Sequence, residues 1–149
     1  MIRYFAYGSN LDVDSMQERC PQANVLGPGC LQGFRLTFTW HSTGWGCGVA
    51  DVVESTDDEV WGLVYSITTT DLEALDRYEG YPRCYGRSQA TIQTRKATLE
   101  NVWLYTVREK AEFIAPSCLY VDILKRACAD YAFPAAYARM LEQIKLIKG

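Results

Sequence analysis

The segment Tyr7-Gly8-Ser9-Asn10-Leu11 places small and polar residues directly after an aromatic, strand-like stretch. Because glycine has no side chain, the backbone at Gly8 can approach a ligand closely. Successive N–H groups in a glycine turn form a concave surface that binds an anion or a developing oxyanion. The alternative is an ordinary tight turn in which Ser9 and Asn10 bond to neighbouring backbone groups. On spacing alone, the ordinary turn is the simpler interpretation.

A second candidate is Glu79, which follows a helical pattern and precedes Gly80. A carboxylate at a helix C-terminus meets the negative end of the helix dipole, which is unfavourable by up to about 1 kcal/mol. The neighbouring Tyr78 and Tyr81 side chains can also shield it from water. Both effects raise the pKa of Glu79, as a general base working near neutral pH requires. The alternative is a solvated helix end with a glycine cap.

Metal and thiol chemistry have little support in the sequence. His41 is the single histidine, which disfavours Ser-His and Cys-His catalytic pairs. The six cysteines form no Cys-x-x-Cys pair, which is a common mark of a zinc site. Because the sequence has no export-signal layout, we expect reduced thiols and a cytoplasmic protein.

Strand and helix patterns predict the elements that position these residues. Strands are predicted over 2–7, 34–40, 49–53, 59–67, 87–93 and 101–107, and helices over 13–19, 71–78, 119–131 and after Pro134. Turns are predicted at 27–29 and 57–58, the second joining 49–53 and 59–67 into a hairpin. Thr70, with Glu73 three residues later, is predicted to cap the helix before Glu79, and Ser117 the helix over 119–131.

The order of these elements predicts an α+β fold rather than regular β-α-β alternation. A length of 149 residues and a hydrophobic content of 48% suit one domain over residues 1–149. The net charge is only -3 and no Lys/Arg block occurs, so neither nucleic acid nor a membrane is an expected partner. No apolar run approaches the roughly 20 residues that a membrane-spanning helix needs.

Four segments, in order, resemble the γ-glutamylcyclotransferase family, also described as AIG2-like. Residues 4–11 are similar to the family's N-terminal motif, and residues 58–65 to its central strand. Residues 75–80 resemble the segment that carries the family's catalytic glutamate, which corresponds to Glu79. Residues 115–120 resemble a later segment whose active-site tyrosine corresponds to Tyr120. This ordered set favours a binding loop over an ordinary turn at Gly8.

The resemblance implies a small mixed β-barrel with surrounding helices, and neither a metal nor an organic cofactor. It implies that the free α-amine of a γ-glutamyl group attacks its own γ-carbonyl, releasing 5-oxoproline and an amine or amino acid. Glu79 is then the catalytic acid and base. A small γ-glutamyl molecule is the expected partner, and a homodimer is a candidate assembly. The expected substrate-binding residues are Tyr7, Gly8, Ser9, Asn10, Leu11 and Tyr120.

Alternatives to this function stay open at the level of sequence. The same scaffold could remove a γ-glutamyl protecting group from a γ-glutamylamine or a biosynthetic intermediate. A non-catalytic small-molecule-binding module could keep the pocket, although a pure binding site has no need of a base such as Glu79. The stretches 46–48 and 83–85 differ from animal members of the family, which leaves the identity of the leaving group open.

Overall fold

The computed structural model of the protein describes residues 1–148. Its strands close into a barrel in the order β1-β3-β2-β4-β5. Neighbouring strands are antiparallel except β1 and β5, which are parallel, so the predicted mixed α+β barrel is confirmed. The strands are β1 (Ile2–Ala6), β2 (Asn24–Ser42), β3 (Cys47–Ile67), β4 (Tyr85–Thr94) and β5 (Thr98–Val107). The helices are α1 (Val13–Arg19), α2 (Thr69–Glu79), α3 (Cys118–Asp130) and α4 (Ala135–Glu142), and a 3-10 turn, η1, covers Ser9–Leu11.

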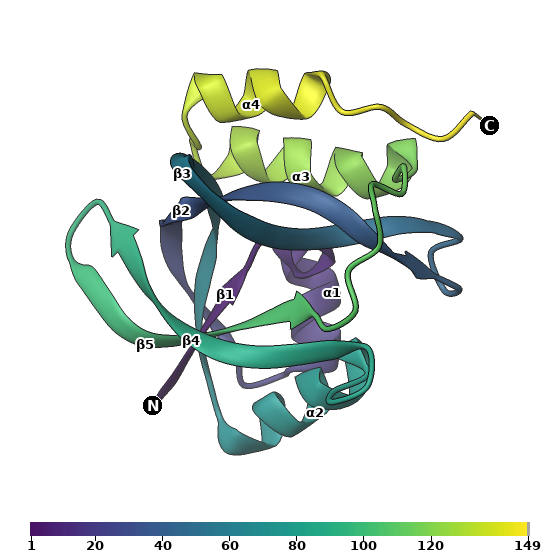
Figure 1. The fold of residues 1–149 in the computed structure, drawn as a ribbon. Helices are drawn as coiled ribbons and strands as arrows, with labels where there is room; N and C mark the ends of the chain where they lie inside the picture. The colour runs from purple at the N-terminus through teal and green to yellow at the C-terminus, as the bar shows by residue number, and fades with distance from the viewer. Residues whose placement is uncertain (149) are drawn as a thin grey trace.

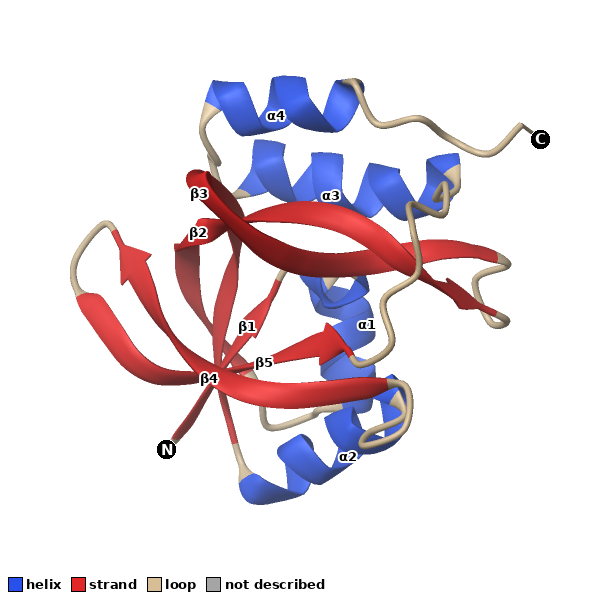
Figure 2. Ribbon diagram, viewed as in Figure 1, coloured by secondary structure: helices blue, strands red, loops and turns tan. Residues whose placement is uncertain are grey.

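The helices cover the outside of the barrel. Helices α3 and α4 lie side by side over the long β2–β3 ribbon, with α1 and α2 below it (Figure 1). The C-terminal end of α2 and the tip of the β2–β3 hairpin project toward the same side of the molecule (Figure 2). None of the helices within residues 1–148 has the length and apolar character that crossing a membrane requires.

The β2–β3 hairpin differs from the sequence prediction. Strand β3 continues through Asp57 and Asp58, so the predicted turn there is wrong, and the hairpin turn lies at residues 43–46. The acidic side chains are exposed on an unbroken strand. Consecutive acidic residues are also common in turns, so the sequence alone suggests a turn here. The predicted turn at 27–29 is also wrong, because this segment pairs with residues 62–64 of β3 next to a bulge.

Local signals at the helix ends are mostly correct. Helix α2 is capped by Thr68 rather than the predicted Thr70, and its capping box closes on Asp71. The Asp71 amide donates to the Thr68 hydroxyl at 3.1 Å, and the Thr68 amide donates to the Asp71 carboxylate at 3.0 Å. Ser117 caps α3 as predicted, since its hydroxyl accepts from the Tyr120 amide at 3.1 Å. All six cysteines are free.

Candidate active site

A cavity of about 610 Å³ opens between the loop after β1, the C-terminal end of α2 and the tip of the β2–β3 hairpin. The predicted site residues that line it are Tyr7, Gly8, Ser9, Asn10, Glu79 and Tyr120. Leu11 does not line this cavity, because the η1 turn directs its side chain into the core, where it is 4% exposed. It lies instead beside a smaller cavity between α1 and α3.

Gly8 is in contact with a tyrosine that comes from the other end of the chain. A Cβ atom at this position would lie 2.7 Å from the Tyr120 hydroxyl and 3.2 Å from the Ala50 Cβ. The next residues form a 3-10 turn in which the Leu11 amide donates to the Gly8 carbonyl at 3.0 Å. Gly8 therefore allows the Tyr120 hydroxyl to rest directly on the backbone of the loop.

The remainder of the loop is fixed by side chains from α1 and α2. The buried Asn10 amide group donates to the Tyr4 hydroxyl at 2.9 Å and accepts from the Arg19 guanidinium at 2.5 Å. The same guanidinium stacks on the Tyr78 ring at 3.5 Å from its centroid. The hydroxyls of Tyr78 and Ser9 lie 3.0 Å apart. Arg19 thus links the loop to the helix end that carries the candidate base.

Glu79 occupies the last position of α2. Gly80 ends the helix in the left-handed conformation, with φ of 70°, and its amide donates to the Arg77 carbonyl at 3.3 Å. The half-buried Glu79 carboxyl group faces the cavity. Loss of hydration on burial raises the pKa of Glu79 to about 7, and the nearby Arg19 charge opposes this rise. The group therefore exchanges protons near neutral pH.

Two buried tyrosine hydroxyls are held by one residue of β3. The Ala50 amide donates to the Tyr120 hydroxyl at 3.0 Å, and the Tyr85 hydroxyl donates to the Ala50 carbonyl at 2.7 Å. Tyr7 donates to the Tyr105 carbonyl across the barrel. Burial raises the pKa of Tyr7, Tyr85 and Tyr120, so these groups serve as neutral hydrogen-bonding partners.

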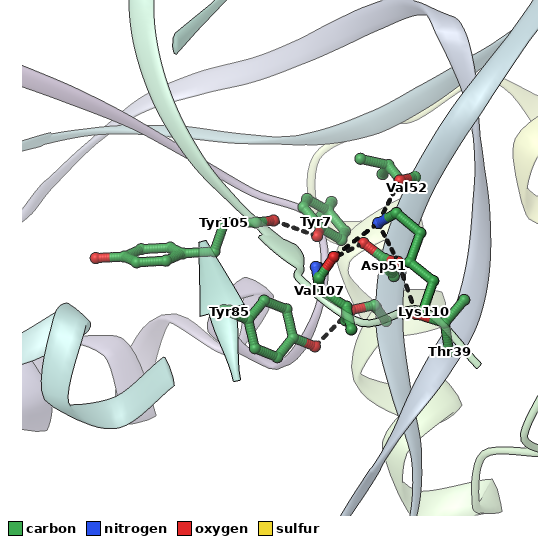
Figure 3. Close-up of polar contacts among 9 residues, drawn as sticks. Tyr7, Thr39, Asp51, Val52, Tyr85, Tyr105, Val107 and Lys110 are labelled. Atoms are coloured by element: carbon green, nitrogen blue, oxygen red, sulfur yellow. Dashed lines mark hydrogen bonds and ion pairs between the residues drawn. The ribbon is translucent and has the colours of Figure 1, made fainter. Parts of the chain in front are cut away.

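A buried carboxylate adjoins this tyrosine cluster. Asp51, which is 0% exposed, accepts from the Thr39 hydroxyl at 2.6 Å, the Val107 amide at 3.0 Å and the Lys110 ammonium at 2.6 Å (Figure 3). These partners come from β2, β5 and the segment after β5. Because Asp51 follows Ala50 in β3, this network fixes the strand that holds Tyr85 and Tyr120.

A second network attaches α2 to the barrel. The Tyr105 hydroxyl donates to the Asp76 carboxylate at 2.7 Å, and the Arg87 guanidinium lies 3.0 Å from the same oxygen. Asp76 is one helical turn before Glu79, so the contact constrains the position of the carboxyl group that follows it. Arg87 is itself placed between the Tyr81 and Trp103 rings, 4.8 and 4.6 Å from their centroids.

Sequence reasoning missed several residues that build the site. Tyr85 lies outside the predicted strands, Tyr105 is a single tyrosine within one of them, and Arg19 is an ordinary charge near a predicted helix end. A signal existed for Asp51 only, because a lone carboxylate inside an apolar strand pattern implies a buried partner. The other contacts join segments 9–98 residues apart, and no local pattern encodes them.

Comparisons with known proteins find relatives of this chain in sequence and in fold. The family model described as "Gamma-glutamyl cyclotransferase, AIG2-like" matches residues 4–121. A bovine and a human protein named "Gamma-glutamylcyclotransferase" are 30% and 31% identical to this chain. Each match covers 95% of this chain and 78% of the relative. A solved structure named "Gamma-glutamyl cyclotransferase" superposes with a TM-score of 0.92 at 28% identity, over 99% of this chain and 90% of its own.

Proposed function

The chain belongs to the γ-glutamylcyclotransferase family, and we propose that it cyclises the γ-glutamyl group of a small molecule to 5-oxoproline, releasing an amine or amino acid. The observation that carries this proposal is the Glu79 carboxyl group. It lies in the same cavity as the Gly8 loop, and its pKa of about 7 suits a group that must both accept and return a proton.

The reaction begins with the substrate's α-ammonium, which cannot attack a carbonyl until it loses a proton. Glu79 accepts that proton, and the free amine nitrogen then forms a bond to the γ-carbonyl carbon. The carbonyl π electrons move to oxygen and give a tetrahedral oxyanion. When the oxyanion collapses, the bond to the leaving nitrogen breaks and Glu79 returns the proton to that nitrogen. The new ring nitrogen gives up its surplus proton, which the released amine takes up at neutral pH, so the products are the neutral lactam and an ammonium group. Such proton transfer is typically worth about 10²–10⁴-fold in rate.

The loop after β1 is the proposed holder of the substrate's negative charge. The Leu11 and Asp12 amides bond within the η1 turn, whereas the Ser9 amide lies near the Tyr120 hydroxyl in the cavity. Amides of Ser9 and Asn10 and the Tyr120 hydroxyl are the proposed donors to the α-carboxylate or the oxyanion. Tyr7 lines the cavity beside these donors. Leu11 packs in the core beneath the η1 turn and is not a proposed substrate contact.

Glu79→Gln tests the proposal. The variant should fold and still gain thermal stability from a γ-glutamyl ligand, while 5-oxoproline formation falls by about 10²–10⁴-fold, because glutamine accepts no proton. Product is measured by mass spectrometry over a panel of γ-glutamyl substrates. Glu73→Gln, an exposed position on the same helix, is the matched control and should keep wild-type rates. Wild-type turnover by Glu79→Gln would eliminate the proposed role.

The setting of the enzyme is part of the same proposal. We propose a single domain over residues 1–149, as the length suggests, that acts on a small molecule in the cytoplasm; the small net charge of -3 and the absence of a Lys/Arg block favour neither nucleic acid nor a membrane as a partner. A homodimer is the candidate assembly. Light scattering coupled to size-exclusion chromatography gives the mass of the assembly directly.

A further inference from the structure

The cavity is larger than a γ-glutamyl group alone requires. Its volume of about 610 Å³ lies within the range of about 300–1,000 Å³ that accommodates drug-sized ligands. Beyond the Gly8 loop and Glu79, the cavity extends along the tip of the β2–β3 hairpin, residues 40–45. This outer part of the cavity, the hairpin subsite, is lined by residues that the proposed γ-glutamyl site does not use.

Planar rings dominate the hairpin subsite. Trp40, His41 and Trp45 all line it. The Trp45 ring meets the Tyr120 ring edge to face, with centroids 5.1 Å apart and an interplanar angle of 86°. Trp45 is still 36% exposed, which leaves apolar surface of a large side chain open at the cavity. Tyr120 therefore touches the Gly8 loop with its hydroxyl and the hairpin subsite with its ring.

The Trp45 ring is held in place before any ligand binds. The Gly46 amide donates to the Ser42 carbonyl at 2.7 Å, and the Trp45 amide donates to the Ser42 hydroxyl at 3.2 Å. Gly46 completes the turn with φ of 69°. A ring fixed by its turn and by Tyr120 loses little conformational freedom when a ligand packs against it.

The charges around the cavity restrict the ligand further. Among the described residues that line it, Glu79 is the one carboxylic acid, whereas Arg77 and His41 are basic side chains at its exposed side. The Arg77 guanidinium favours a leaving group with its own carboxylate, while the ammonium of an amide-linked diamine finds no carboxylate at the cavity other than Glu79. The charge pattern thus matches an amino acid better than a polyamine.

We infer that the hairpin subsite binds the leaving group and selects γ-glutamyl amino acids with an aromatic or large apolar side chain. This inference rests on the proposed function for the γ-glutamyl half of the ligand. Full burial of such a side chain against Trp40 and Trp45 is worth about 10- to 100-fold in affinity over a glycine leaving group. The preference therefore appears both in binding and in kcat/KM.

The test compares γ-glutamylphenylalanine, γ-glutamylglycine and γ-glutamylputrescine. Their Kd values are measured by calorimetry on Glu79→Gln protein, and kcat/KM on otherwise wild-type protein. The phenylalanine compound should exceed the glycine compound by about tenfold or more in both measurements. Trp45→Ala should bring this ratio close to one, and Trp45→Phe should preserve most of it. Phe113→Ala removes a similarly exposed aromatic side chain that does not line the cavity, and it should leave the ratio unchanged.

The outcomes separate the two proposals. Equal or better use of the glycine or putrescine compound, with 5-oxoproline formed, overturns the hairpin subsite and leaves the cyclisation intact. A phenylalanine preference that survives Trp45→Ala also overturns it. Tighter binding of the phenylalanine compound that depends on Trp45, with no 5-oxoproline from any compound, supports the subsite and overturns the cyclisation.

Discussion

Glu79→Gln should make the protein more stable at neutral pH while it removes activity. In the native state the pKa of Glu79 is raised from 4.5 to about 7, chiefly because burial disfavours the charged form. Between these two pH values the folded protein binds more protons at this site than the unfolded chain does. The free energy of unfolding therefore falls as pH rises through this window. Glutamine has nearly the same shape and carries no such penalty.

The size of the effect follows from the shift in the pKa. A difference of 7 minus 4.5, or about 2.5, corresponds to roughly 3.4 kcal/mol at about 1.36 kcal/mol for each pKa unit. Glu79 is half-buried at the cavity, where solvent screens part of this energy, so a gain of about 1–3 kcal/mol is expected. The gain should be near zero at about pH 4.5 and complete above about pH 8.

The assay is urea denaturation of wild-type and variant protein between about pH 4.5 and 8.5. All other titrating groups are shared, so the difference between the two curves isolates Glu79. Glu73→Gln serves as the control, because an exposed substitution on the same helix should stay within about 0.5 kcal/mol of the wild type. A difference between Glu79→Gln and wild type that is flat with pH, or that favours the wild type above pH 7, refutes the argument that burial holds this carboxyl group near neutrality.

Three further substitutions test the surroundings of the site. Gly8→Ala should cost about 1–3 kcal/mol of stability, because its Cβ would lie 2.7 Å from the Tyr120 hydroxyl. Urea denaturation should show a smaller cost for the same substitution in a Tyr120→Phe background. Strictly additive costs of the two substitutions would contradict this contact. Arg19→Gln should raise the pKa of Glu79, so the acidic limb of the kcat/KM profile should move to higher pH; an unmoved limb argues against the coupling. Lys110→Met should cost about 1–3 kcal/mol in denaturant titrations, because the buried Asp51 carboxylate loses a cation that is itself 38% exposed but keeps its bonds from Thr39 and Val107. A cost below about 0.5 kcal/mol counts against that pair.

Much of the barrel follows from local patterns in the sequence. Alternating apolar residues over 34–40 mark a strand because one of its faces packs in the core, where Phe38 is buried. The apolar run over 59–67 marks a second strand, which is buried on both faces from residue 62 onward. Composition suggests turns that the structure does not have at two places. The acidic residues at 57–58 lie on an exposed part of β3. The Gly/Pro residues at 27–29 lie on β2 next to a bulge, which tolerates them. Closure of the barrel depends on the parallel contact between β1 and β5, whose pairing of Tyr4 with Trp103 has no local signature.

The site could be predicted only in part for the same reason. The Gly8 loop and Glu79 are short local motifs, and each is ambiguous until the fold brings them to one cavity. The groups that orient them act over long separations, as with Tyr7 on Tyr105 and Tyr120 on Ala50. Contacts of this kind arise from barrel closure and from the packing of α3, so they cannot be inferred from residue spacing.

The proposed proton transfer depends on two opposing influences on the pKa of Glu79. Burial alone would hold the carboxyl group protonated at neutral pH, and a protonated carboxyl cannot accept a proton from the substrate ammonium. The Arg19 charge favours the carboxylate and limits that rise. Because Arg19 also bonds Asn10 and stacks on Tyr78, the charge that lowers the pKa of Glu79 belongs to the side chain that links the Gly8 loop to α2. A substitution that removes this guanidinium group should therefore alter both the anchoring of the loop and the pKa of the proposed base.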